Sequence, residues 1–98
     1  MPYAIEFSPQ AIEHLEFLRA ADRKTLIVAI HRRLTFEPTR ETRNRFRMRE
    51  NPLAPWELRV GALRAFYDVL EERRTVLIVA VGRKVGNRLM IAGEEIQL

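Results

Sequence analysis

Residues 56–69 read Trp-Glu-Leu-Arg-Val-Gly-Ala-Leu-Arg-Ala-Phe-Tyr-Asp-Val, and this stretch decides how the chain folds. Apolar and charged side chains alternate on both sides of Gly61-Ala62, which is the period of a half-buried strand. A glycine followed by a small residue suits the tight turn of an antiparallel pair. The stretch therefore predicts a β-hairpin that presents Glu57, Arg59 and Arg64 on one face. The other face receives Trp56, Leu58, Val60, Leu63, Ala65, Tyr67 and Val69.

The chain beyond the hairpin predicts a turn and two further strands. Residues 71–74 are charged and predict the turn. Residues 75–81 are apolar on both faces, which is typical of a central strand covered on both sides. Residues 87–92 predict a last, shorter strand, and residues 94–95 an acidic tail end.

The chain before the hairpin begins with a strand and two helices. Residues 3–7 predict the strand, and Ser8 followed by Pro9 is typical of a helix start. Asp22 predicts the N-cap of a second helix, which Glu37-Pro38 would stop. Helical spacing places the apolar side chains of the two helices at Ala11, Ile12, Leu15 and Leu18, and at Leu26, Ile27, Ile30 and Leu34. The short link between the helices predicts a helical hairpin.

An arginine-rich stretch lies between the helices and the hairpin. From Thr42 the period is two, so a strand would carry four guanidinium groups on one face, with Phe46 and Met48 on the other. Those four are Arg43, Arg45, Arg47 and Arg49. Two interpretations stay open: the stripe binds an RNA backbone, or it is an edge strand protected by charge. Residues 51–55 predict a loop.

Length and composition limit the class of protein. The 98 residues carry a net charge of +4 and no cysteine, which predicts one globular domain over residues 1–98 without disulfides. All of the excess charge lies in residues 40–64, and this favours an anionic partner. Neither a metal site nor a cofactor is expected, and His14 and His31 are interpreted as surface residues. With no apolar span and no signal peptide, we expect a cytoplasmic protein.

Together these elements predict an α+β fold. An N-terminal helical hairpin would pack on a mostly antiparallel sheet of four to six strands.

The hairpin also resembles the RelE/ParE superfamily of type II toxin–antitoxin systems. The family shows a strand that ends in Arg-Val-Gly, a turn, and then Tyr/Phe-Arg-Val-x-Tyr-x-Val. Here these become Arg59-Val-Gly61 and Leu63-Arg-Ala-Phe-Tyr-Asp-Val69. A later family strand ends in Val-Gly and basic residues, and residues 80–84, Ala-Val-Gly-Arg-Lys, are similar to it.

The resemblance implies a toxin held inactive by a cognate antitoxin. RelE-like members are ribosome-dependent endoribonucleases that cleave mRNA and inhibit translation. ParE-like members share the fold but inhibit DNA gyrase. A third possibility is a toxin-like domain that is catalytically inactive and only binds. The family alone leaves this choice open.

For a nuclease, the resemblance implies a site built from basic residues. Arg64 would stabilise the transition state, and Arg59 and Lys84 would hold the phosphate, with Arg83 as a further RNA contact. Glu57 stands where RelE-like members have a basic residue, and is either a general base or an ion-pair partner. Met90 stands by spacing where these nucleases often have a tyrosine base. Tyr67 is interpreted as core, and Asn87 either positions a phosphate or caps a turn.

Overall fold

The computed structural model describes residues 1–98 and contains two helices and seven strands. A single turn of 3-10 helix, Glu71–Arg73, joins two of the strands. No helix is both long enough and apolar enough to span a membrane. In chain order the elements are β1 (Ala4–Phe7), α1 (Pro9–Glu16), α2 (Ala20–Leu34), β2 (Arg45–Arg47), β3 (Trp56–Val60), β4 (Leu63–Leu70), β5 (Thr75–Val85), β6 (Arg88–Ile91) and β7 (Glu94–Ile96).

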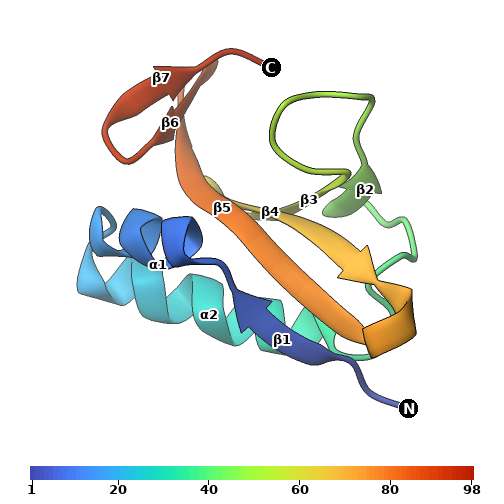
Figure 1. The fold of residues 1–98 in the computed structure, drawn as a ribbon. Coiled ribbons are helices and arrows are strands. Elements are labelled where there is room, and N and C mark those ends of the chain that lie inside the picture. The colour runs from blue at the N-terminus through green and yellow to red at the C-terminus, as the bar shows by residue number, and fades with distance from the viewer.

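The strands form one sheet in the order β2-β3-β4-β5-β6-β7, and β1 pairs with β5 (Figure 1). The β1–β5 pair is parallel and every other pair is antiparallel. The predicted α+β fold class is confirmed. The sheet has one strand more than expected, because residues 94–96 pair with β6 and are not an acidic tail.

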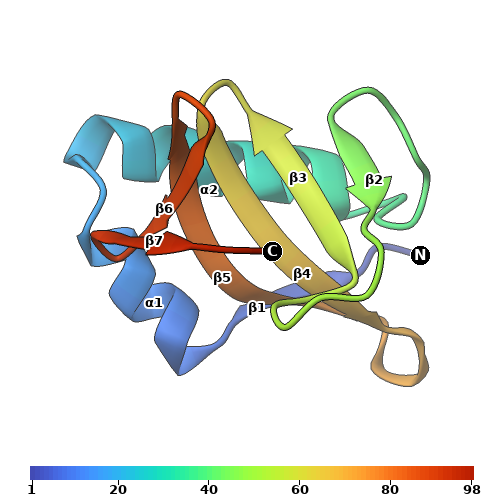
Figure 2. The same ribbon diagram turned by 90° about the horizontal axis from the view of Figure 1, so that it is seen from above.

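Both helices lie on the same face of the sheet, and we call this the covered face (Figures 1 and 2). Its core joins the predicted apolar stripes of the helices to alternate residues of β3, β4 and β5, among them Leu58, Tyr67 and Val81. The Tyr67 hydroxyl is buried and donates to the carbonyl of Pro38 at 2.7 Å, as befits a core tyrosine.

A local sequence signal explains the start of α1 but not the two ends of α2. The Ser8 Oγ accepts a hydrogen bond from the Ala11 N–H at 3.0 Å, so the predicted N-cap is confirmed. The Asp22 cap is wrong: α2 begins at Ala20, and Asp22 lies in its first turn, 3.6 Å from Arg19. The helix also ends at Leu34, before Glu37-Pro38. Ile12, expected on the apolar face of α1, is instead exposed to solvent.

The other face of the sheet carries no helix, and we call it the open face. Here the β6–β7 hairpin on one side and the loop between β2 and β3 on the other rise beside the strands (Figure 2). Gly82 makes room for the β6–β7 hairpin, because a Cβ at this position would lie 2.4 Å from the Met90 carbonyl oxygen. A smaller apolar cluster, which includes Phe66 and Leu89, forms the base of this face.

Candidate active site

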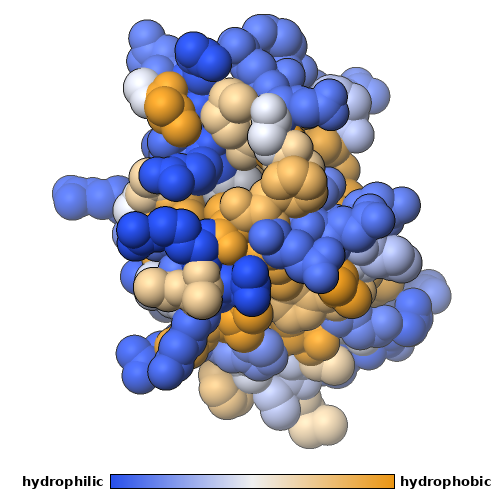
Figure 3. Space-filling view, turned by 90° about the vertical axis from the view of Figure 1, so that its left-hand side faces the viewer, coloured by the Kyte–Doolittle hydropathy of each residue, from blue (hydrophilic) through white to orange (hydrophobic).

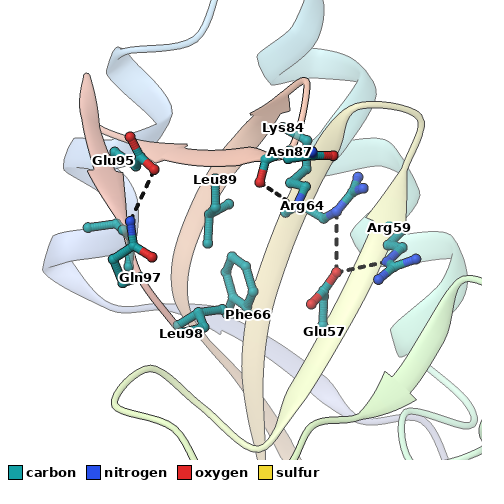
Figure 4. Close-up of a pocket in the computed structure, with 11 residues that line it drawn as sticks. Glu57, Arg59, Arg64, Phe66, Lys84, Asn87, Leu89, Glu95, Gln97 and Leu98 are labelled. Carbon is teal, nitrogen blue, oxygen red and sulfur yellow. Dashed lines mark hydrogen bonds and ion pairs between the residues drawn. The ribbon is translucent and has the colours of Figure 1, made fainter.

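Four of the sequence-predicted residues converge in one cleft on the open face. Arg59 and Arg64 are directly paired across the β3–β4 hairpin, and Glu57 lies two residues before Arg59 on the same side of β3. Lys84 comes from β5, whose residue Gly82 pairs with Arg64. The four side chains line a cleft of about 260 Å³ (Figure 4). The alternation of the hairpin therefore predicted the geometry correctly.

A buried carboxylate holds the two arginines of the cleft. Glu57 Oε2 lies 2.9 Å from Arg59 Nε and 3.2 Å from Arg64 Nε. The Glu57 side chain is only 9% exposed, whereas that of Arg59 is 48% exposed. The Arg59 guanidinium also lies over the Phe46 ring, with its Cζ 4.5 Å from the ring centroid. One oxygen thus orients both cations toward the same space.

Arg64 is the more rigidly placed of the two arginines. Its side chain is 12% exposed, and its Nη1 donates to the carbonyls of Gly61 at 2.7 Å and Leu63 at 2.9 Å. Its other terminal nitrogen has no hydrogen-bond partner in the protein. Burial lowers the pKa of the Arg64 guanidinium, while the nearby Glu57 carboxylate raises it. A desolvated, oriented guanidinium with a free donor is well suited to bind a phosphate oxygen.

The remaining walls of the cleft come from β6, β7 and the turn before them. Lys84 Nζ lies 3.4 Å from the Asn87 carbonyl oxygen. On the opposite side, Glu95 accepts a hydrogen bond from Gln97 Nε2 at 3.1 Å. Phe66 and Leu89 lie between these two polar sides (Figure 4). The cleft thus has a cationic wall, an apolar base and a polar wall, which suits an anion with an attached organic group.

Solved structures with this architecture are RelE toxins and their complexes. A chain in the RelBE2 toxin–antitoxin complex of Mycobacterium tuberculosis is 24% identical, with a TM-score of 0.74 over 86% of this chain and 93% of that chain. The isolated Escherichia coli RelE toxin is 22% identical, with a TM-score of 0.66 and 87% of each chain covered. The RelE–RelB complex of Pyrococcus horikoshii is 20% identical, with a TM-score of 0.65 over 85% of this chain and 96% of that chain. The chain has the RelE fold. No protein-family model and no curated protein sequence matches it.

Within this RelE fold β2 is an edge strand, as one interpretation expected, but the four arginines do not form one stripe. β2 contains only Arg45–Arg47, because Arg43 lies in a turn and Arg49 follows the strand. Its register places Arg45 opposite Leu58 and Arg47 opposite Trp56, on the covered face. The Arg45 guanidinium binds the carbonyls of Arg33 and Arg40. The prediction failed because a three-residue edge strand does not hold seven residues in one alternation.

Arg83 is also separated from the cleft. Successive strand residues point to opposite faces, so Lys84 faces the cleft while Arg83 faces the helix side. There Arg83 lines a hollow of about 210 Å³ beside His14 and Phe17 of the α1 region. The two adjacent basic residues, Arg83 and Lys84, therefore face opposite sides of the sheet. The RNA contact expected of Arg83 stays a prediction.

Met90 lies in the same hollow as Arg83. It pairs with Arg83 across β5 and β6, whereas its neighbour Leu89 pairs with Lys84 and faces the cleft. Apolar surface appears on this side of the molecule between hydrophilic side chains (Figure 3). The residue expected at the family's tyrosine position thus points away from the cleft, so its chemistry does not bear on the site.

Sequence analysis missed the wall that β7 supplies. Glu95, Gln97 and Leu98 line the cleft, although residues 94–95 were expected to be a tail. The available signal was the alternation of Ile96 with polar neighbours after Gly93, a glycine with positive φ. Three residues are too few for a period to stand out.

Proposed function

We propose that this protein is the toxin of a type II toxin–antitoxin system and that it is a ribosome-dependent endoribonuclease. The support is the cleft, in which Arg59, Arg64 and Lys84 face a common space on a RelE fold. The similar structures include a RelE toxin and toxin–antitoxin complexes. A cognate antitoxin, mRNA and the ribosome are accordingly the proposed partners.

The proposed reaction is transesterification of RNA. The ribose 2′-oxygen attacks the adjacent phosphorus, the bond from phosphorus to the 5′-oxygen breaks, and a 2′,3′-cyclic phosphate remains. One proton leaves the 2′-hydroxyl and one reaches the departing 5′-oxygen. In this proposal Arg64 stabilises the charge that develops on the phosphorane, and Arg59 and Lys84 bind the same phosphate. Fixed, water-poor donors make the largest contribution to such a reaction.

Two carboxylates line the cleft, and we assign them different roles. Glu57 is bound by two guanidinium groups through a single oxygen, so its carboxylate is already engaged in orienting both arginines. We therefore propose Glu57 as a positioning residue for Arg59 and Arg64. Glu95 lies on the opposite wall with its side chain 41% exposed, and only one of its oxygens forms an ion pair, at 3.3 Å from Nε of the exposed Arg88. We propose Glu95 as the acceptor of the 2′-hydroxyl proton.

The test is cleavage of a ribosome-bound message by purified protein. Wild type should cut the message, and Arg64→Ala should be slower by roughly a hundredfold or more, the loss seen when one such donor is removed. The matched control is Arg73→Ala, an exposed arginine paired with Glu6 at 3.0 Å away from the cleft. An intact message after incubation with folded wild type would end the nuclease proposal.

The gyrase alternative was motivated by methionine at the family's tyrosine position, and Met90 does not face the cleft. One further assay on the same purified proteins distinguishes a nuclease from a gyrase inhibitor. We expect DNA supercoiling by gyrase to proceed unchanged in their presence. Inhibition of supercoiling with no cut message would replace the nuclease by a gyrase inhibitor. Harmless expression without any antitoxin would favour the inactive domain.

A further inference from the structure

A second basic groove lies where the end of α2 meets the loop that leads to β2. It has a volume of about 350 Å³. Arg32, Arg33 and Phe36 line it from the helix side, and Asn44 and Arg45 from the loop side. The two sides come from different parts of the chain: Arg32 and Arg33 lie in residues 1–39, which have no net charge, and Arg45 lies in residues 40–64. Only the fold brings them together.

The guanidinium groups of this groove are largely free of acidic partners. Neither Arg32 nor Arg33 forms an ion pair, although Arg33 Nη1 donates to the Arg59 carbonyl at 3.3 Å. The single carboxylate in the lining, Glu37, is already neutralised by Arg40 at 3.0 Å. Cations in the last turn of a helix interact favourably with its dipole, which accounts for two arginines there. The third cation, Arg45, comes from another element and binds the carbonyls of Arg33 and Arg40 at this end of the helix.

Phe36 gives the groove a second chemical property. It is 68% exposed, the most exposed aromatic side chain of the molecule, and it stands among the guanidinium groups. An exposed aromatic ring in a basic groove is the combination that binds single-stranded nucleic acid, because bases stack on the ring while cations hold the phosphates. An acidic protein segment would use the charges but has no comparable need of the ring.

The groove is joined to the cleft through Arg59. The Arg59 side chain lines the cleft, its carbonyl accepts from Arg33, and its N–H donates to the Asn44 carbonyl at 2.7 Å. The backbone of one residue thus touches both sides of the groove while its side chain serves the cleft. The groove and the cleft therefore lie on the two opposite faces of the sheet at Arg59.

We propose that this groove binds single-stranded RNA, with a base stacked on Phe36 and phosphates on Arg32 and Arg33. The inference extends the proposed nuclease function and rests on it for the identity of the strand. The RNA is either the message itself or an unpaired segment of ribosomal RNA, which offer the same chemistry.

The test measures binding separately from cleavage. A fluorescent 2′-O-methyl RNA of about 12 nucleotides, within the span of single-strand binders, lacks the attacking hydroxyl and stays intact. Phe36→Ala should weaken its binding roughly tenfold, as for loss of one stacked base. Arg32→Gln with Arg33→Gln should weaken binding and reduce the slope of log affinity against log salt by about 1.4, the value for two phosphate contacts on a single strand. Pelleting of the groove variants with ribosomes in a parallel experiment shows whether the bound strand is the message or ribosomal RNA.

The matched control removes two exposed arginines elsewhere, in Arg19→Gln with Arg73→Gln. Equal losses in both double variants would reduce the effect to net charge and overturn the inference. So would unchanged RNA binding in the groove variants, including a result in which they lose only the binding of polyglutamate, an acidic peptide measured in parallel. If the groove variants lose RNA while wild type cuts no message, the nuclease proposal fails and the groove stands. If wild type cuts the message and the groove variants bind normally, the groove fails alone.

Discussion

The two faces of one sheet differ in what holds their side chains in place. On the covered face, Leu58, Ala65 and Tyr67 are fully buried beneath the helices. On the open face, the intervening residues Glu57 and Arg64 are held by ion pairs and by hydrogen bonds to main-chain carbonyls. The same strands therefore stabilise the fold with one set of residues and orient charge with the other.

This difference predicts a separation of effects. Substitutions on the open face should reduce activity more than stability, because the exposed cations make few packing contacts. Substitutions on the covered face should reduce the free energy of unfolding and leave the chemistry intact. The predictions below run from the largest expected effect to the smallest.

Arg64→Lys is the sharpest test of the open face. Lysine keeps the charge but has no planar fork, so it cannot replace the bonds to Gly61 and Leu63 while also binding phosphate. We expect cleavage to slow by roughly a hundredfold, measured in single turnovers. The free energy of unfolding, measured with urea, should fall by about 1 kcal/mol. If the rate loss, converted to an activation free energy, were no larger than the loss in unfolding free energy, the open face would not act on activity more than on stability.

Glu57→Gln tests whether the open face also contributes to stability. It removes a buried charge from two guanidinium groups and should lower the free energy of unfolding by about 1–3 kcal/mol. Glu37→Gln is the matched control, because its pair with Arg40 has nearly the same length, 3.0 Å, but both side chains are more than half exposed. That control should change stability by about 0.5 kcal/mol or less.

The same Glu57 variant separates positioning from proton transfer. A positioning role predicts slower cleavage with the shape of the pH–rate profile retained. Loss of the acidic limb of that profile would make Glu57 the general base instead. In Glu95→Gln we expect the acidic limb to disappear.

Tyr67→Phe probes the covered face. The substitution deletes a buried hydroxyl that donates to the Pro38 carbonyl, and leaves that carbonyl unpaired. We expect the free energy of unfolding, measured by heat or urea, to fall by about 1–2 kcal/mol. The cleavage rate of the folded protein should be unchanged. A selective loss of rate would show that the two faces are coupled.

His14 predicts a pH dependence of the covered face. Its Nδ1 accepts the Val81 N–H at 3.4 Å, and burial lowers the pKa of this histidine below 6.5. The folded chain therefore binds fewer protons than the unfolded chain as pH falls. Stability should be constant above about pH 6.5, the unfolded value, and should decline below it. His14→Gln should remove this part of the decline in urea titrations across pH 5–8, and an unchanged curve would exclude His14 as its source.

The smallest effect is expected at the former stripe. Arg43 and Arg49 are exposed, form no ion pair and lie outside β2. Arg43→Gln with Arg49→Gln should shift the free energy of unfolding by about 0.5 kcal/mol or less. RNA affinity should fall less than in the Arg32→Gln, Arg33→Gln double variant. A larger fall in RNA affinity would show that residues 43–49 bind RNA, as one interpretation of the sequence predicts.

The sequence predicted the elements that strong local signals specify. Ser8 and Pro9 set the start of α1, and Gly61 adopts the positive φ that the β3–β4 turn requires. Alternation in residues 56–69 placed Glu57, Arg59 and Arg64 together, because both strands have neighbours that enforce the pleat. It failed at residues 43–49, where an edge strand of three residues leaves the rest of the segment to turns.

By itself the sequence determined the fold class, the hairpin and the face on which its charges lie, because period and turn chemistry are local properties. Only the tertiary structure decided that β7 walls the cleft, that Arg83 and Met90 face away from it, and that Arg32 and Phe36 join Arg45 in a second groove. These placements depend on the close approach of β6 to Gly82 and on where α2 ends against the loop. Both follow from packing between segments distant in the chain, which no local pattern of residues encodes.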